Sequence, residues 1–493
     1  MENEIKGDVK KSAKWVIINK ILVSVFALLQ VVILTRFLEK SDFGLISMSM
    51  VVVNLSNVFV EMGLTSALLH RQKASNNEYS SVYWMNISIS LIFYIITYFS
   101  APFAADFYSD IRLCPIIELL GLNLVFVTLG KVHRTLLQKE FRFKHIFIGE
   151  FTSVFVALVL AIYLAYMGFG VYSMVYSTLV KSFVSSIIYV CSDFKRHPIF
   201  FKFSISHIKH YTRVGGFSMG AAILDYFASE IDVIIIGKLL GTNSVGVYSL
   251  VKQLVLRIYR FVNPVITTIL SPYLSKLQDS QDHLRSTYIK IVKLVARINF
   301  PIYMCIAICS KQIIEILYGS VYVEGSFVLV CLSISYAVQT ISNPVGSLQI
   351  ATGRTDLAML WTFIRIFLVS IIVYIASYYG TNGIAIGLVF LSVVFTYVIW
   401  IVMISKMISL SFVDYLRCFY LISLLTLVVI IIFKGIVNVN IENNYILIFF
   451  NSVASCVLLY LICFFADKES FRFYTNKLAS LFTSVKNRFI ISV

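Results

Sequence analysis

Eight basic residues lie inside segments that are otherwise apolar enough to cross a membrane. They are Lys20, Lys181, Lys252, Arg257, Arg260, Lys293, Arg297 and Arg365. On the lenient insertion scale a cation at the bilayer centre costs roughly 2.5–3.5 kcal/mol, so eight cations facing lipid would cost on the order of 20 kcal/mol. We therefore expect these side chains to face a wet interior, a carboxylate partner or an anionic ligand.

Most of these cations gather on two consecutive predicted helices. Lys252, Arg257 and Arg260 fall within an arc of about 140°, and Lys293 and Arg297 share one side of the next helix, at about 100° per residue. Arg holds a diphosphate or carboxylate through two parallel hydrogen bonds, and Lys adds a compact charge. We predict an anion-binding surface from these residues together with one lysine of the first span: Lys20, Lys252, Arg257, Arg260, Lys293 and Arg297. The alternative for Lys20, Lys252, Arg257, Arg260 and Arg297 is that the side chain reaches out to the membrane interface.

Of the acidic residues in predicted spans, three are candidates for a role in charge balance or coupling. Asp225 and Asp232 are seven residues apart and share a helix face, and Glu61 lies in the second span. A carboxylate within the membrane is a candidate proton relay. Two interpretations remain open: these acids couple transport to protons or sodium, or they neutralise the neighbouring cations.

Motifs for catalysis and for cofactor binding are missing from the sequence. There is no HExxH, no Ser/His/Asp spacing and no GxxxxGK[ST], and Cys305 and Cys309 are not completed to a metal-binding set. We expect no enzymatic activity, no cofactor and no metal.

The composition predicts an all-α polytopic membrane protein. Of 493 residues 59% are hydrophobic and only 13% are charged, whereas a soluble domain carries about 25% charged residues. Blocks of about 20 apolar residues are long enough to cross the hydrocarbon core. Fourteen spans are predicted: 13–37, 44–68, 80–103, 113–132, 146–166, 169–191, 214–236, 245–271, 288–309, 325–350, 357–378, 381–404, 413–433 and 445–466.

The loops predict the orientation and the domains. Alternate connections and both termini are rich in Lys and Arg, which places them in the cytoplasm. The segment from Ile33 to Ser47 resembles that from Ile235 to Ser249 at a constant offset of 202 residues, which indicates a parallel repeat. We predict two six-helix lobes around a central cavity, 1–196 and 214–404, joined by a cytoplasmic interfacial linker at 197–213. Two additional spans (405–466) and a basic amphipathic cytoplasmic tail (467–493) follow.

Several short patterns resemble one family of transporters. They are Glu61-Met62-Gly63-Leu64-Thr65-Ser66-Ala67-Leu68-Leu69 with the following Asn76 to Asn86, Ile231-Asp232-Val233-Ile234-Ile235-Ile236-Gly237, and Ser271-Pro272-Tyr273-Leu274-Ser275-Lys276-Leu277. With the span number, the orientation and the lobe repeat, they are similar to Wzx-type polysaccharide flippases of the multidrug/oligosaccharidyl-lipid/polysaccharide exporter superfamily. Related lipid II flippases place cations on spans 1, 2 and 8; here span 2 offers only Glu61, which is a departure.

The resemblance implies a flippase of the bacterial inner membrane. It would move an undecaprenyl-diphosphate-linked oligosaccharide from the cytoplasmic to the outer leaflet by alternating access, with polysaccharide polymerase and glycosyltransferases as further partners. Two alternatives stay open: a drug/cation antiporter of the same superfamily, which a positive cavity disfavours because it would repel cationic drugs, and a non-transporting scaffold of the polysaccharide machinery. Nucleic acid is not an expected partner.

Overall fold

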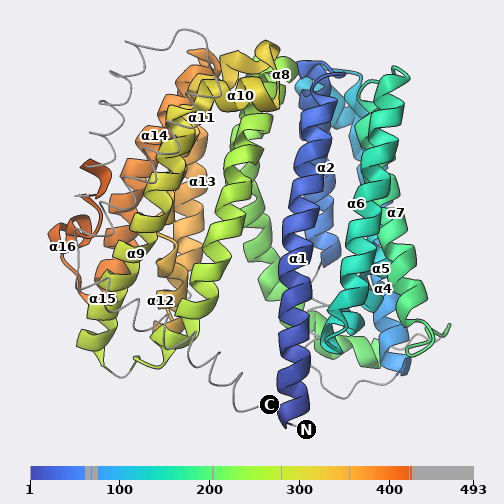
Figure 1. Cartoon of the computed structure of the whole chain (residues 1–493), viewed down its shortest axis with the longest axis horizontal. Coiled ribbons are helices and arrows are strands. Elements are labelled where there is room, and N and C mark those ends of the chain that lie inside the picture. Colours follow the sequence, from blue (N-terminus) through green and yellow to red (C-terminus); the bar gives the residue numbers. More distant parts are fainter. Residues whose placement is uncertain are drawn as a thin grey trace. The chain divides into compact units, whose positions relative to one another are not determined.

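A computed structural model describes residues 2–61, 68, 76–201, 205–278, 280–354, 356–420 and 422–424 (Figure 1). Within these ranges every regular element is a helix. Among the described residues, ten helical segments are long and apolar enough to cross a membrane. Large apolar side chains point outward from them: Phe99, Phe103 and Phe367 are 69%, 75% and 66% exposed. Contiguous exposed apolar surface of this kind suits lipid rather than water, and the chain is a multi-pass membrane protein.

The first six predicted spans are confirmed, with shifted ends. The helices are α1 (Glu2–Leu34), α2 (Lys40–Glu61), α4 (Asn76–Tyr108), α5 (Leu113–Lys139), α6 (Phe143–Tyr166) and α7 (Tyr172–Asp193). Helix α7 packs against α5 and α6, α4 against α5, and α1 against α6. The turn from α6 to α7 uses Gly168 and Gly170 at φ 82° and 53°, a region that glycine enters without steric cost.

Predicted spans 7 and 8 join almost without a loop in α8 (Ile205–Ser275). Gly241 alone interrupts the helical backbone, at φ 78° and ψ −179°, a conformation that is essentially restricted to glycine. The helical stretches on either side are 205–240 and 242–275. The sequence predicted an eight-residue connection here, but helical hydrogen bonding continues up to the glycine because no residue before it breaks the pattern.

The following elements are shorter and more interrupted. They are α9 (Gln281–Ile308), α10 (Ser310–Leu317), a 3₁₀ turn (Ser320–Gly325), α11 (Ser326–Thr340), α12 (Pro344–Thr352), α13 (Asp356–Ser377), α14 (Gly380–Ile399), a π-helical turn (Trp400–Ile404), α15 (Ser405–Ile408) and α16 (Phe412–Arg417). Pro344 begins α12 at a break in predicted span 10, because proline fits the first turn of a helix and not its interior.

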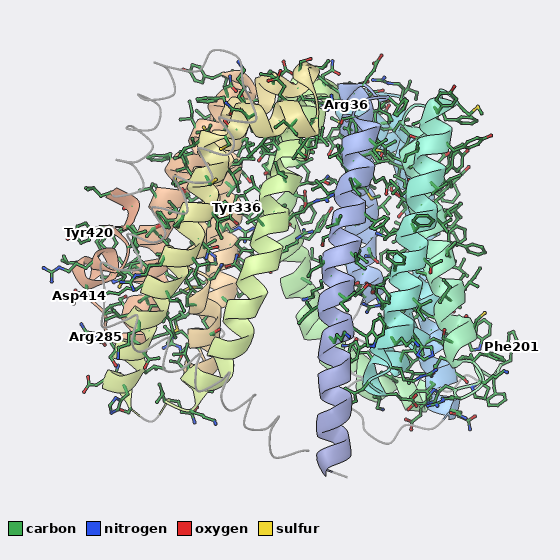
Figure 2. The ribbon with its side chains drawn as sticks, viewed as in Figure 1. Arg36, Phe201, Arg285, Tyr336, Asp414 and Tyr420 are labelled. Carbon is green, nitrogen blue, oxygen red and sulfur yellow. The ribbon has the colours of Figure 1, made fainter. Side chains whose placement is uncertain are left out.

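The start of α16 is tied to α9. The Ser411 hydroxyl accepts a hydrogen bond from the Asp414 amide at 3.1 Å, which caps the helix. Arg285 of α9 lies 3.3 Å from the Asp414 carboxylate (Figure 2). Residue 421, the second half of predicted span 13 from residue 425, all of span 14 and the amphipathic tail lie outside the described residues.

The chain divides into two compact units. The first comprises Met1–Leu250 with Leu317–Gly319, and the second Val251–Ile316 with Ser320–Val493. The residues from 205 to 250 thus pack with the first six helices. The lobes predicted at 1–196 and 214–404, with their linker and additional segments, stay predictions.

Candidate functional site

Five of the six predicted cations lie on helices of the second unit. Lys252, Arg257 and Arg260 lie on α8, and Lys293 and Arg297 on α9. Lys252 is buried, with 7% of its surface exposed, while Arg260 is exposed and the other three are half-buried. These residues therefore lie on helices, as the spacing predicted; their common role in binding stays a prediction.

Tyrosines join the two cation-bearing helices within this unit. Tyr259 of α8 and Tyr303 of α9 both meet Tyr336 of α11, with ring centroids 5.7 Å and 6.5 Å apart (Figure 2). The Tyr259 hydroxyl donates to the Asn343 side-chain oxygen at 2.6 Å. Arg365 of α13 is near enough to Tyr259 to interact electrostatically. These contacts connect α8, α9 and α11 close to Arg257 and Arg260 in the chain.

Lys293 is near enough to Cys418, directly after α16, to interact with it electrostatically. Lys293 and Arg297 are one helical turn apart, so their side chains lie on one side of α9.

Lys20 belongs to the first unit and is exposed on α1. Its neighbour Asn19 donates to the Glu150 carboxylate of α6 at 2.7 Å. The other oxygen of Glu150 accepts two hydrogen bonds from the Arg134 guanidinium of α5, at 3.2 Å and 2.8 Å. One carboxylate thus connects three helices beside Lys20.

The first unit contains a second ion pair, between Lys131 and Glu61, that the sequence did not predict. The Lys131 ammonium of α5 lies 3.8 Å from the Glu61 carboxylate of α2, with the lysine side chain only 18% exposed and that of Glu61 63%. The sequence ended the fourth span at 132 and assigned Arg134 to a loop. The sequence did contain a signal for a longer helix, because no Gly or Pro follows Lys131 before residue 139. In the structure α5 continues to Lys139, with Leu136 and Leu137 buried.

The two aspartates of α8 have different environments. Asp225 is exposed. Asp232 is buried, and its carboxylate accepts hydrogen bonds from the Tyr248 hydroxyl and from the Val233 amide. The hydrogen bond from Tyr248 links the two stretches of α8 on either side of Gly241. Coupling through Asp225, Asp232 or Glu61 stays a prediction.

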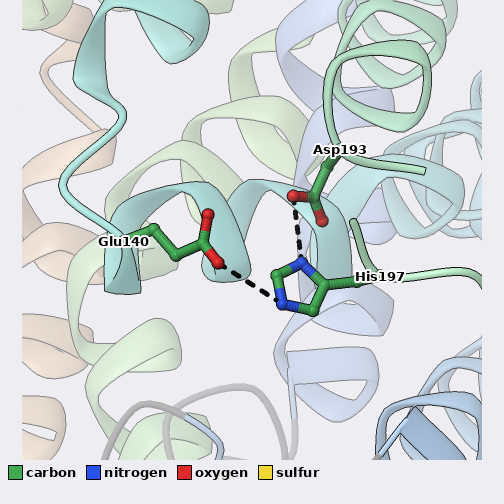
Figure 3. A group of neighbouring side chains, drawn as sticks. All are labelled: Glu140, Asp193 and His197. Carbon is green, nitrogen blue, oxygen red and sulfur yellow. Dashed lines mark hydrogen bonds and ion pairs between the residues drawn. The ribbon is translucent and has the colours of Figure 1, made fainter. Parts of the chain in front are cut away.

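A buried polar network lies where the C-terminal ends of α5 and α7 meet the N-terminal end of α6. Asp193 is completely buried and accepts from His133 at 3.1 Å, from His197 at 3.1 Å and from Arg142 at 3.3 Å. The second His197 nitrogen lies 3.4 Å from Glu140 (Figure 3).

The geometry of Glu140, Asp193 and His197 would allow a metal ion. However, Arg142 forms ion pairs with the carboxylates of Asp193 and Glu140, and Arg196 lies 3.4 Å from Glu140. A metal ion bound here would be repelled by these two guanidinium groups. We interpret the cluster as an ion-pair network that fixes three helix ends and the segment leading away from α7.

That segment is also held on α4. The Phe200 amide donates to the Ser80 hydroxyl at 2.9 Å, and the Trp84 indole donates to the Phe200 carbonyl at 2.9 Å. Phe201 stacks on Trp84. Residues 194–201, where the cytoplasmic linker was predicted to begin, are therefore part of the first unit.

Comparison with known proteins supplies the family. The family model described as "Polysaccharide biosynthesis protein" matches residues 33–326, more than half of the chain. The chain is 25% identical over 421 residues to the lipopolysaccharide biosynthesis protein WzxC of Escherichia coli (strain K12), covering 85% of this chain and 86% of WzxC. It is 24% identical over 358 residues to the teichuronic acid biosynthesis protein TuaB of Bacillus subtilis (strain 168), covering 72% and 74%.

Among solved structures, the lipid II flippase MurJ in its inward closed conformation has the same fold. The TM-score is 0.69 at 15% sequence identity, and the match covers 95% of this chain and 99% of MurJ. Identity this low shows the fold alone. The family model and the relatives together show that the chain belongs to the polysaccharide biosynthesis protein family.

Proposed function

We propose that this protein is a flippase that moves an undecaprenyl-diphosphate-linked oligosaccharide from the cytoplasmic to the outer leaflet for surface polysaccharide biosynthesis. The observation that carries the proposal is the set of cations on α8 and α9, two helices of a multi-pass membrane protein. Family membership supports it, as does the similarity to WzxC, a lipopolysaccharide biosynthesis protein, and to TuaB, a teichuronic acid biosynthesis protein.

The chemistry of the substrate matches such a surface. A diphosphate can accept paired hydrogen bonds from Arg257, Arg260 and Arg297, and Lys252 and Lys293 can add point charges. Each hydrogen bond to a charged group contributes about 1.5–3 kcal/mol. The sugar lies among polar and aromatic side chains, while the polyprenyl tail remains in lipid.

The Lys131–Glu61 ion pair suggests how the charge of Lys131 is balanced when no substrate is bound. Because Glu61 is the more exposed partner, an entering diphosphate can replace it on Lys131. The displaced carboxylate is then free to take up a proton. Glu61 and the exposed Asp225 are thus our candidates for coupling to a proton or sodium gradient.

Alternating access requires two bodies that move against each other. We assign this role to six-helix lobes at 1–196 and 214–404, with both termini in the cytoplasm of a bacterial cell, in its inner membrane. The basic loops support this orientation. A polysaccharide polymerase on the outer side and glycosyltransferases on the inner side are the expected partners.

The test uses a strain that lacks the gene and is complemented with variants. Arg257→Ala and Arg297→Ala should each lower surface polysaccharide at matched protein amounts, since each removes a donor to the diphosphate. Lys290→Ala is the matched control, because Lys290 is an exposed cation on α9 outside the proposed set. Wild-type polysaccharide in both arginine variants would contradict the cation site.

Reconstitution separates the transport classes. Purified protein in vesicles with a defined lipid-linked glycan should speed leaflet exchange, and an imposed pH gradient should change the rate if protons are coupled. Uptake of a cationic drug without glycan exchange would instead identify an antiporter. No movement of either compound would favour a scaffold.

A further inference from the structure

The two copies of the sequence repeat pack against each other through a pair of equivalent glycines. A Cβ atom placed on Gly44 of α2 would overlap the carbonyl of Thr242, and one placed on Gly246 of α8 would overlap the carbonyl of Lys40. Gly246 follows Gly44 by 202 residues, and Thr242 follows Lys40 by the same 202 residues. The glycine of each repeat therefore packs against a backbone carbonyl of the other repeat. This reciprocal arrangement is typical of a contact with two-fold symmetry.

The contact is made by backbone rather than by side chains. Lys40 begins α2, and Thr242 begins the stretch of α8 after Gly241. A Cβ atom on Gly246 would also lie 3.1 Å from the Gly44 nitrogen. Helices approach this closely in a membrane only where small residues lie at the crossing.

The same seam continues along α2. A Cβ atom on Gly237 would lie 2.8 Å from Met48 and 2.7 Å from Tyr108. Further along, the Tyr226 hydroxyl donates to the Val51 carbonyl at 2.6 Å. The seam between 226–246 and α2 thus extends over residues 40–51, or about 17 Å at 1.5 Å per residue. It explains why residues up to Leu250 belong to the first unit.

We infer that this seam, defined as Lys40, Gly44, Thr242 and Gly246, is the outer gate of the transporter. The inference rests on the proposed function. The α1–α2 turn and Gly241 both lie on the predicted outer side, so the seam closes that side. Its parting is required before a flipped glycan can leave.

Substitution of the glycines tests the gate. Gly44→Ala and Gly246→Ala each insert a methyl group against a carbonyl, so both should bias the seam toward its parted state. The matched control is Gly346→Ala, because Gly346 is also helical and a Cβ atom there meets nothing within 4 Å.

The reporter is a cysteine at Ser249 in a cysteine-free background. Ser249 is one turn beyond Gly246 and only 5% exposed. A membrane-impermeant maleimide is added to intact cells. We expect slow labelling of the parent and labelling about fivefold faster or more in both alanine variants, with export reduced. Gly346→Ala should match the parent. Fast labelling of the parent, or unchanged labelling in both alanine variants, overturns the gate.

A second comparison separates the gate from the proposed substrate. Labelling of the parent reporter is measured in cells that make the lipid-linked glycan and in cells blocked in its synthesis. Faster labelling with the glycan supports both proposals. Equal labelling, combined with faster labelling in the alanine variants, keeps the gate and contradicts the proposed substrate.

Discussion

Lys131 of α5 and Glu61 of α2 form an ion pair across 3.8 Å, with the lysine largely shielded and the carboxylate mostly exposed. The pair joins residues that are 70 positions apart in the chain. A shielded cation whose partner faces outward can exchange that partner for another anion. This property fits the task of holding a charged headgroup for part of a cycle and then releasing it.

We expect Lys131→Gln to lower surface polysaccharide by about tenfold or more, because losing one hydrogen bond from the lysine to the diphosphate costs about 1.5–3 kcal/mol. The measurement is polysaccharide per cell at matched amounts of protein. Lys144→Gln is the control, since Lys144 is exposed near the start of α6. Equal losses in the two variants would show that general charge, and not this pair, matters.

The carboxylate of Glu150 should couple Asn19 and Arg134 energetically. Because Arg134 is 46% exposed, solvent screens the pair, and we expect a coupling energy of about 0.5–1 kcal/mol. A double-mutant cycle of Glu150→Gln and Arg134→Gln, read as thermal unfolding midpoints in detergent, measures it. Additive effects would mean that the bonds contribute no net stability.

Asp193 should be the most sensitive position of the polar network. Asp193→Asn removes a buried charge that neutralises Arg142 and orients two histidines, and breaking such a buried pair costs about 3–5 kcal/mol. We expect little folded protein in membranes, measured by fluorescence-detected size-exclusion chromatography. Glu140→Gln should be milder, because its side chain is 31% exposed. A reversed order would contradict the central role of Asp193.

Tyr248→Phe tests whether Asp232 is structural. The change removes the hydroxyl that donates to the buried carboxylate, at a cost of about 1.5–3 kcal/mol. If Asp232 only stabilises α8, the unfolding temperature should fall while the response of transport to a pH gradient is unchanged. A lost or shifted response in reconstituted vesicles would instead assign Asp232 to proton coupling. Asp225→Asn provides the comparison at an exposed acid on the same helix.

Much of the architecture was readable from local patterns. Apolar blocks of about 20 residues predicted the helices from α1 to α7, and the helical period placed Arg257 and Arg297 on helices of the second unit. Helix ends were less predictable. Span 4 was expected to end at 132, yet α5 continues to Lys139, because a charged residue does not end a helix unless the backbone also turns, here at Phe141 with φ 57°.

Hydropathy, charge and internal similarity were enough to predict the membrane class, the cations on two consecutive helices and the repeat that relates Gly44 to Gly246, because these are properties of residues along the chain. The folded chain was needed to show that Lys131 meets Glu61, that Asp193 accepts from residues 133, 142 and 197, and that each glycine packs on the other repeat. Such pairings depend on how helices cross, and crossing depends on side-chain shape over many residues.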